Sequence, residues 1–461
     1  MGIIGTGDTF FLGRLVRSPS LTELLLSGQV NNSRLSVSDT DPDQKRLLLW
    51  LRKKTTMGYS KQALRGFGWH SVVTFLTATM TALKLAFLAR LLDQREFGLF
   101  AYITIALGLT ESITETGINV TIIQAKESIK YFLNTAWVIA IFRGLIIGLV
   151  MLGMGVSMSS FFSEPNLTVL VGLAALVPVV KGFINPAIVT LHKELRFFRD
   201  SVYRLSLLVV EAGLAVLLAW YWHSVTALVV AMIGAAVFEV IISFLLFRLR
   251  PVFEYIPSRA KSIFNNAKGL SVSAALSYIS ENVDDLILGK LLGTAPLGLY
   301  HTGYSLTHRA TLGVSQSLSH GAFPVFAQFR TDLPRLKRAF LKSFLGLSLL
   351  LVAVLIPLIG FPKLIIEIIL GQKWLAVVPA LPWLAAAGAL QALTSLCYTV
   401  MTSTESYKQM NAHRIFGLIV FVPLFLWLSL QFGLLGAAMG WAIARAISFP
   451  VVFWLVLRRL K

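Results

Sequence analysis

The stretch LARLL at residues 88–92, followed by FGLF at 97–100, recurs as LGKLL at 288–292, followed by LGLY at 297–300. The offset is 200 residues for both segments, so the two copies keep one register and form an internal repeat. Six apolar segments separate the copies, and an even number of membrane crossings gives two copies the same orientation. We therefore expect two six-helix bundles related by a pseudo-two-fold axis along the membrane normal.

The composition indicates that this repeat lies in a membrane. Of the 461 residues, 56% are hydrophobic and 14% are charged, whereas a soluble domain carries about 25% charged residues. The mean hydropathy is +0.74, and the apolar segments reach the roughly 20 residues that cross the hydrocarbon core. We predict an all-α polytopic membrane protein with about twelve transmembrane helices, at residues 69–92, 97–122, 131–159, 166–191, 203–222, 224–247, 268–294, 297–327, 339–361, 375–402, 412–431 and 434–457.

The repeat and the polar stretches divide the chain. Residues 1–56 are polar and turn-rich, which predicts either a disordered N-terminal extension or a true start at Met57. We expect the first bundle at 57–250 and the second at 268–461. The basic, proline-containing stretch 251–267 is expected to be a cytoplasmic linker.

The basic residues are distributed unevenly between the two sides of the predicted membrane. The chain has 41 Lys and Arg residues against 22 Asp and Glu residues, a net charge of +19. In the alternate loops, 26 basic residues lie on one side, and the other side has five: Arg90, Arg95, Lys290, Lys363 and Lys373. Because Lys and Arg are retained on the cytoplasmic side, we predict that both termini are cytoplasmic. Topology accounts for most of the positive charge, and no nucleic-acid partner is expected.

Catalytic and metal-binding motifs are missing from the sequence. The chain has one cysteine, Cys397, and it lacks the H-E-x-x-H, phosphate-loop, dinucleotide-binding and G-x-S-x-G patterns. We therefore expect a protein that is not an enzyme, that binds no metal and that needs no cofactor other than a proton or sodium gradient.

Five motifs in order along the chain resemble one family of transporters. They are ARLLDQREFGLFAY at 89–102, TETGINVTIIQAKE at 114–127, DDLILGKLLGTAPLGLY at 284–300, Phe323-Pro324 and LGQKW at 370–374. Together they resemble the Wzx-type polysaccharide and O-antigen flippases of the multidrug/oligosaccharidyl-lipid/polysaccharide exporter superfamily, over residues 60–461.

The resemblance implies a two-bundle, V-shaped transporter in the bacterial inner membrane. Such a protein flips an undecaprenyl-pyrophosphate-linked glycan by alternating access. The implied partners are the lipid-linked glycan, membrane lipids, and the polymerase and chain-length regulators of the same pathway.

Ionisable residues inside the spans are candidates for function, because each costs roughly 2.5–3.5 kcal/mol to insert. The basic candidates for binding the pyrophosphate are Lys84, Arg143, Lys181, Arg309 and Arg445. The alternative is structural pairing with Glu111, Glu211 or Glu239 inside one bundle. His308 and His320 are interpreted as ordinary polar residues of the eighth span.

Acidic residues crowd together at two places. Glu281, Asp284 and Asp285 lie close on one predicted helix, and Glu111 and Glu115 share a face of another. Crowded carboxylates in a low dielectric can carry a proton or a sodium ion. The alternative is that they pair with the basic residues within the membrane.

The repeat also predicts a gate. At the offset of 200 residues, Lys84 of the first half is equivalent to Asp284 of the second. Opposite charges at equivalent positions could close the outer side of the transporter and separate when it opens. The alternative is that Lys84 extends outward to the membrane surface and Asp284 pairs locally, for example with Lys290.

Other functions remain open. A multidrug or cation exporter of the same superfamily should have an acidic, aromatic site, and a lipid II flippase usually has two further spans. A glycosyltransferase or polymerase would need a large catalytic loop outside the membrane, and a purely structural scaffold would not need so many charges within it.

Overall fold

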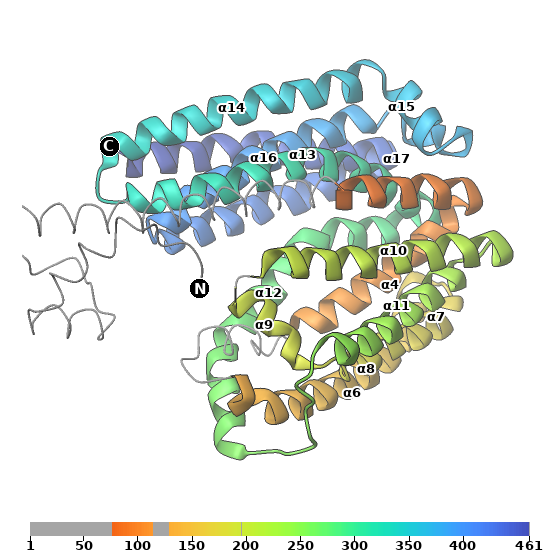
Figure 1. Ribbon diagram of the computed structural model, residues 1–461. Helices are drawn as coiled ribbons and strands as arrows, with labels where there is room; N and C mark the ends of the chain where they lie inside the picture. The colour runs from red at the N-terminus through yellow and green to blue at the C-terminus, as the bar shows by residue number, and fades with distance from the viewer. Residues whose placement is uncertain (1–75, 114–128, 195, 461) are drawn as a thin grey trace, which may run out of the picture. The chain divides into compact units, whose positions relative to one another are not determined.

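The computed structural model describes residues 76–113, 129–194 and 196–460, and these residues belong to one compact unit. The described residues contain helices and no strands, which confirms the all-α fold (Figure 1). The predictions for residues 1–56, for Glu115 and for the motif at 114–127 lie outside the described residues.

The first half is a series of helices that follow the predicted spans. They are a helix over residues 76–91, α4 (Gln94–Ile113), α6 (Ile129–Phe162), α7 (Asn166–Ala174), α8 (Leu176–Lys181), η1 (Pro186–Val189), α9 (Thr190–Lys193), α10 (Phe197–Trp222) and α11 (Val225–Leu246). The fourth predicted span is broken into short pieces. Asn185 caps one of them, since its side chain accepts a hydrogen bond from the backbone N–H of Ala187.

The second half also consists of helices that follow the predicted spans. They are α12 (Pro257–Leu292), α13 (Thr294–Gln328), α14 (Leu333–Gly360), α15 (Pro362–Ile369), η2 (Gln372–Val377), α16 (Leu381–Ser403) and α17 (Tyr407–Arg459). Gly433 has φ +57° and divides α17 at the boundary between the last two predicted spans. Helix α12 begins at Pro257, inside the stretch 251–267 that we expected to be a linker.

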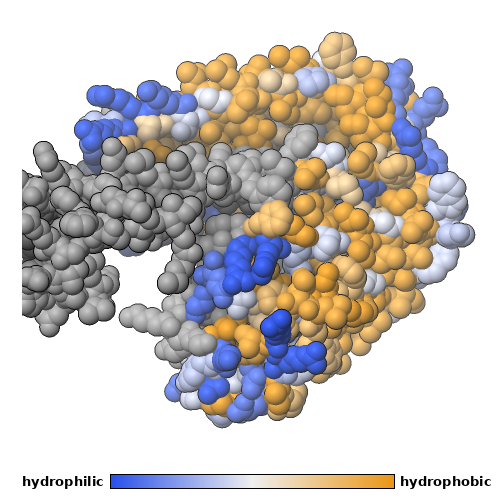
Figure 2. Space-filling model, viewed as in Figure 1, coloured by the Kyte–Doolittle hydropathy of each residue, from blue (hydrophilic) through white to orange (hydrophobic). Residues whose placement is uncertain are grey.

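The helices are suited to a membrane. Among the described residues, six helices are long and apolar enough to cross one: α6, α10, α11, α14, α16 and α17. Figure 2 shows hydrophobic residues over most of the visible face of both halves, with hydrophilic residues gathered mainly toward the helix ends. Large apolar side chains such as Leu149 and Leu245 are exposed. The structure supports a polytopic membrane protein, and the count of twelve crossings stays a prediction.

The first helix of each half contacts the other half. Helix α12 of the second half packs against α4 and α6 of the first half (Figure 1). Its counterpart in the repeat, the helix over 76–91, contacts the second half, because the backbone carbonyl of Ala89 accepts a hydrogen bond from Trp374 Nε1 at 2.8 Å. These two sets of contacts connect the halves.

The two halves meet along α4 and α13, and two glycines make the contact close. A Cβ atom on Gly98 would lie 1.9 Å from the carbonyl oxygen of Thr294, and one on Gly298 would lie 1.9 Å from that of Gln94. Residues 94 and 98 are equivalent to residues 294 and 298 at the offset of the repeat, so the two contacts are reciprocal. The pseudo-two-fold axis therefore passes between these glycines.

Candidate functional site

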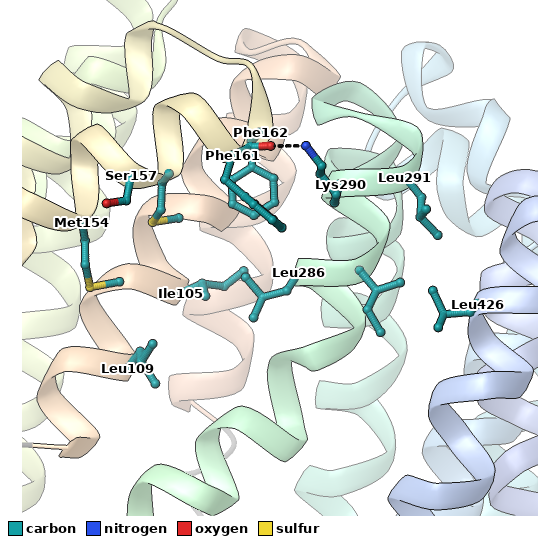
Figure 3. Close-up of a pocket in the computed structure, with 12 residues that line it drawn as sticks. Ile105, Leu109, Met154, Ser157, Phe161, Phe162, Leu286, Lys290, Leu291 and Leu426 are labelled. Carbon is teal, nitrogen blue, oxygen red and sulfur yellow. Dashed lines mark hydrogen bonds between the residues drawn. The ribbon is translucent and has the colours of Figure 1, made fainter.

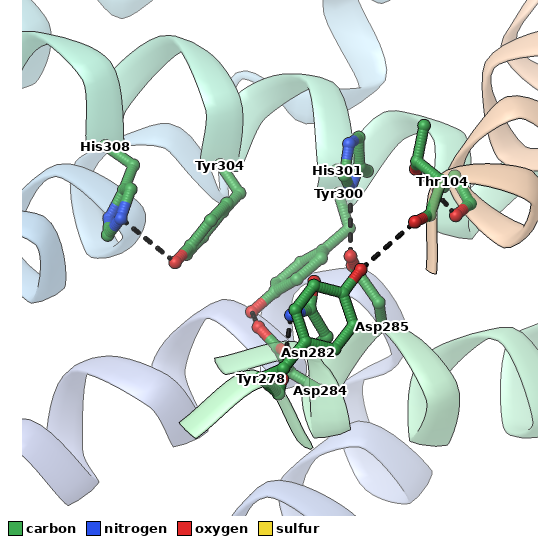
Figure 4. Close-up of polar contacts among 10 residues, drawn as sticks. Thr104, Tyr278, Asn282, Asp284, Asp285, Tyr300, His301, Tyr304 and His308 are labelled. Carbon is green, nitrogen blue, oxygen red and sulfur yellow. Dashed lines mark hydrogen bonds and ion pairs between the residues drawn. The ribbon is translucent and has the colours of Figure 1, made fainter. Parts of the chain in front are cut away.

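A cluster of polar side chains lies on α12 and α13, where the second half faces α4 (Figure 4). Tyr300 OH donates a hydrogen bond to Asp284 Oδ2 at 2.9 Å, and Asp285 Oδ2 lies 2.8 Å from His301 Nδ1. Asp284 and Asp285 are 4% and 5% exposed. The sequence predicted the two carboxylates, but not the tyrosine and histidine that bind them from the next helix.

The cluster has unused hydrogen-bonding capacity. Within the described ranges, Asp285 Oδ1 and Tyr102 OH are buried without a hydrogen-bond partner. Tyr278 OH donates to the carbonyl oxygen of Thr104 at 3.1 Å and so links α12 to α4 across the two halves (Figure 4). Buried polar atoms are usually satisfied, so this location could hold a proton or a small cation. Glu281, one turn before Asp285, is exposed.

An aromatic stack continues from this cluster along α13. The rings of Tyr304 and His308 stack with centroids 4.5 Å apart, and Trp441 of α17 meets Tyr304 edge-on at 5.1 Å. Arg445 lies over the Trp441 ring, with its guanidinium carbon 5.4 Å from the ring centroid. We had interpreted His308 as an ordinary polar residue, and the structure places it inside this stack; the side chain of His320 lies outside the described residues.

Three of the five basic candidates bind groups of the first half. Lys84 Nζ lies 2.6 Å from Glu211 Oε1, and Lys181 Nζ lies 3.9 Å from Glu111 Oε1. Arg143 donates to the carbonyl oxygen of Glu111 at 3.1 Å. These contacts match the structural alternative for the three residues. Unlike Glu111 and Glu211, Glu239 binds none of the basic candidates among the described residues; it accepts a hydrogen bond from Tyr203 OH at 3.2 Å.

The other two basic candidates lie in the second half. Among the described residues, no carboxylate is within 4 Å of the guanidinium group of Arg309 or Arg445. Arg309 is exposed on α13, and Arg445 is partly buried on α17. Their positive charges are therefore not neutralised by a direct ion pair.

The expected gate between Lys84 and Asp284 does not form in this structure. Lys84 pairs with Glu211, and Asp284 accepts its hydrogen bond from Tyr300. The reason is local: each charge has a closer partner within its own half. A helix repeat fixes equivalent positions along the chain, but it does not fix which side chains point at each other.

Other residues join the halves where the loops after α6 and α14 lie, and we call this region the clasp. Arg90 Nη2 donates to the carbonyl oxygen of Ile368 at 2.9 Å, and its counterpart Lys290 donates to that of Phe161 at 2.5 Å. Two hydrogen bonds at equivalent positions thus cross between the halves in opposite directions.

A second pair of contacts in the clasp obeys the same symmetry. Gln94 Nε2 donates to the carbonyl oxygen of Lys373 at 2.5 Å, and its counterpart Thr294 donates to Glu164 Oε1 at 2.6 Å. Lys373 also pairs with Asp93 at 2.8 Å. From the sequence we assigned Arg90, Lys290 and Lys373 to the outer side but predicted none of these contacts, although the offset of 200 residues between 90 and 290 and between 94 and 294 was a signal for them.

Glu164, in the loop after α6, is one of two acidic residues that the first half contributes to the clasp; the other is Asp93. Glu164 accepts hydrogen bonds from Thr294 and from Arg95, the latter at 2.7 Å. Burial alone would raise the pKa of Glu164, but these two hydrogen bonds outweigh burial and hold the pKa below its usual value of 4.5. Glu164 is therefore charged at neutral pH.

The geometry offers no metal site in the parts of the chain that the structure describes, where no three His, Cys, Asp or Glu residues are grouped to hold an ion. What it offers is the contact between α4 and α13, which we call the seam, with the clasp at one end, a buried acidic cluster on α12, and two arginines of the second half, Arg309 and Arg445, without a carboxylate partner among the described residues.

Comparison with known proteins agrees with this description. Residues 87–379 match the family model described as polysaccharide biosynthesis protein. The chain is 19% identical to the lipopolysaccharide biosynthesis protein WzxC of Escherichia coli K12, over 87% of this chain and 82% of that protein. It is 23% identical to the teichuronic acid biosynthesis protein TuaB of Bacillus subtilis 168, over 86% and 83%.

Solved structures share the fold. An inward-facing multidrug resistance MATE family transporter aligns with a TM-score of 0.60 and 16% identity, over 85% of this chain and 98% of that one. The lipid II flippase MurJ, in an inward closed conformation, aligns with a TM-score of 0.63 and 12% identity, over 85% and 88%. At these identities the likeness concerns the fold alone.

Proposed function

The chain belongs to the polysaccharide biosynthesis protein family, and we propose that it flips an undecaprenyl-pyrophosphate-linked glycan across the bacterial inner membrane by alternating access. The names of its relatives, which include a lipopolysaccharide and a teichuronic acid biosynthesis protein, support a glycan cargo. The single structural observation that carries the proposal is the pair of arginines without a carboxylate partner, Arg309 and Arg445, among the described residues.

An arginine pair suits a pyrophosphate. The guanidinium group presents a planar fork of donors that binds phosphate oxygens in pairs, and it stays charged at any pH in a cell. Lys84 and Lys181 already form ion pairs with Glu211 and Glu111, respectively. We therefore assign the pyrophosphate to Arg309 and Arg445, and we assign Lys84, Lys181 and Arg143 to holding the first half together.

The clasp can open at a modest cost. The four hydrogen bonds made by Arg90, Lys290, Gln94 and Thr294 cross between the halves. If each contributes about 0.5–1.5 kcal/mol, the four together contribute about 2–6 kcal/mol, and the exposed ion pair between Asp93 and Lys373 adds about 0–1 kcal/mol. Differential binding of a cargo can shift an equilibrium of that size. We propose that the clasp closes the periplasmic side, as the charge asymmetry of the loops predicts, and that it opens to release the glycan.

We also propose that a proton or sodium gradient drives the cycle through the acidic cluster. Asp284 and Asp285 are neighbours, both are buried, and both bind side chains of α13. Two adjacent buried carboxylates gain from sharing a cation. A cation bound there would change the contacts between α12 and α13, beside the seam with α4.

A drug or cation exporter of the same superfamily is the second candidate, since MATE transporters share the fold. An exporter of cations needs an acidic wall that its cargo can reach. Here the carboxylates Asp284 and Asp285 are buried, while Arg309 is exposed. This arrangement favours an anionic cargo.

Binding of the two kinds of cargo distinguishes the candidates. In detergent, undecaprenyl pyrophosphate at 100 times its Kd should stabilise the purified protein by about 2.7 kcal/mol. Arg309→Ala and Arg445→Ala should each reduce that stabilisation, whereas Arg338→Ala, at an exposed arginine of α14, should not. Stabilisation by a lipophilic cation, with none by undecaprenyl pyrophosphate, would favour the exporter instead.

A further inference from the structure

A cavity of about 580 Å³ lies between the two halves, on the side of α12 that faces α6 (Figure 3). Helices α4 and α6 of the first half and α12 and α17 of the second supply its walls. We propose that this cavity, which we call the seam groove, binds the polyprenyl chain of the lipid-linked cargo. The inference rests on the proposed function and adds to it the location of the lipid chain.

The lining of the seam groove has the chemistry of a hydrocarbon site. Ile105, Leu109, Leu286 and Leu426 come from three of the helices that surround it, and most of the remaining lining is also apolar. Met154 faces this lining from α6 (Figure 3). Methionine side chains are flexible and polarisable, so they adapt to a chain of irregular shape.

The groove and the polar cluster involve neighbouring residues of α12. Asp284 and Asp285 face the interior of the protein, and Leu286 and Ile287, the next two residues, line the groove. A lipid-linked glycan has a polar head that needs the interior and an apolar chain that must avoid it. A groove beside the polar cluster lets the head lie in the interior while the apolar chain lies in the groove. Burying the apolar chain there gains roughly 25 cal/mol per Å².

The charge at one end of the groove favours the cargo over an uncharged hydrocarbon. Among the lining residues, Lys290 is the only charged one, and it lies at the clasp. Its ammonium group sits 4.7 Å from the centroid of the Phe161 ring and donates to the carbonyl oxygen of Phe161. When the clasp opens, Lys290 loses this acceptor and becomes available to the phosphate as the head leaves Arg309 and Arg445 for the periplasmic side.

The position of the groove between the halves couples it to the transport cycle. The walls belong to both halves, so rocking one half against the other changes the width of the groove. A chain held there would follow the head of the cargo from one side of the membrane to the other. A groove inside a single bundle would not move with the transport cycle.

Photocrosslinking with the lipid alone tests the location of the chain. The photoreactive residue p-benzoylphenylalanine is placed at Leu286 or Met154 in the groove, or at Leu349, an exposed apolar residue of α14 that serves as the control. The proteins are reconstituted in phosphatidylethanolamine and phosphatidylglycerol with radiolabelled undecaprenyl phosphate. We expect at least fivefold more labelling at the groove than at Leu349, and competition by unlabelled undecaprenyl phosphate but not by additional phosphatidylglycerol.

Two results of this experiment would overturn the proposal. Equal labelling at the groove and at Leu349 would mean that the chain has no preferred place. Competition by phosphatidylglycerol as strong as that by undecaprenyl phosphate would mean that the groove takes any acyl chain of the membrane.

Substitutions then separate the groove from the function. Ile287→Trp should fill the groove and reduce both the crosslinking at Met154 and glycan flipping by at least tenfold, while Leu349→Trp leaves both unchanged. Lys290→Gln should lower capture of undecaprenyl phosphate but not of uncharged undecaprenol. Normal flipping by an assembled Ile287→Trp protein would refute the groove and leave the proposed function standing. Absence of flipping by the unsubstituted protein would refute the proposed function, whatever the crosslinks show.

Discussion

The close contact between α4 and α13 predicts that one methyl group will loosen the seam. In Gly298→Ala, the new Cβ atom would lie 1.9 Å from the carbonyl oxygen of Gln94, where an ordinary contact begins at 3.4 Å. The helices must therefore separate by about 1.5 Å at this point. Overpacking of this kind costs roughly 1–3 kcal/mol, which changes an equilibrium constant by about 5- to 150-fold.

A matched control lies on the same helix. Among the described residues, a Cβ atom on Gly313 would meet nothing within 4 Å, so Gly313→Ala adds the same methyl group to α13 without a clash against them. Both substitutions favour the helix by about 0.5–1 kcal/mol. The difference between the two variants therefore isolates the contact with Gln94.

Hydrogen exchange of the purified protein measures the effect. In Gly298→Ala, peptides that cover residues 94–100 and 294–300 should exchange about 5- to 150-fold faster than in Gly313→Ala, because the seam opens more often. The temperature of unfolding should also be lower. Equal exchange and equal unfolding temperatures in the two variants would refute the account of the seam.

Four other outcomes are expected. For topology, water-soluble maleimide should label single cysteines at Trp222 and Lys373 from the periplasm and those at Arg199, Arg259 and Arg335 from the cytoplasm; periplasmic labelling at Arg259 would refute the twelve-span topology and the repeat. Arg309→Ala should lose glycan flipping at normal membrane abundance, and Arg309→Lys should restore only part of it, because an ammonium group lacks the planar fork; normal flipping by Arg309→Ala would move the pyrophosphate elsewhere. Asp285→Asn should abolish the response of flipping to an imposed proton or sodium gradient in proteoliposomes, and an unchanged response would exclude Asp285 as the coupling residue. Folding lowers the pKa of Glu164, so its hydrogen bonds stabilise the folded protein above the unfolded pKa, and this stabilisation is lost as the pH falls through the folded pKa. Between about pH 6 and about pH 3 the unfolding temperature should therefore fall more in the unsubstituted protein than in Glu164→Gln. Equal falls in the two proteins would contradict this.

The fold followed largely from the repeat and from hydropathy. The offset of 200 residues placed Gly98 and Gly298 in equivalent positions, and the structure puts both at the seam. Apolar segments fixed where the helices lie because the membrane requires long apolar stretches with internal hydrogen bonds. The short pieces in the fourth span were not predicted, because hydropathy does not register the capping by Asn185.

The site was predicted in part. The sequence identified Asp284, Asp285, Arg309 and Arg445 as costly charges in a membrane, but their partners depend on how each helix is rotated. Tyr300 and His301 lie on the next helix, and nothing local to Asp284 and Asp285 marks them. The same uncertainty about rotation explains why the predicted contact between Lys84 and Asp284 does not form in this structure. Lys84 instead binds Glu211, at a sequence separation of 127 residues.

The clasp shows what a repeat can reveal when it is used for contacts as well as for topology. Arg90 and Lys290, at equivalent positions, both donate to backbone carbonyl groups of the opposite half. Backbone acceptors carry no mark in the sequence, so a search for opposite charges passes over them. Pseudo-symmetric pairs of donors near the ends of the first helix of each half are the more useful signal.

Flipping by the purified protein tests the central claim most directly. Proteoliposomes that contain a fluorescent undecaprenyl-pyrophosphate-linked disaccharide are treated from outside with a glycosidase that cannot cross the membrane. We predict that the protein exposes the inner-leaflet glycolipid to the enzyme within the time of the assay, that protein-free liposomes keep it protected, and that Arg309→Ala resembles the protein-free liposomes. Continued protection of the inner-leaflet glycolipid in the presence of folded protein, with or without an imposed proton or sodium gradient, would contradict the account.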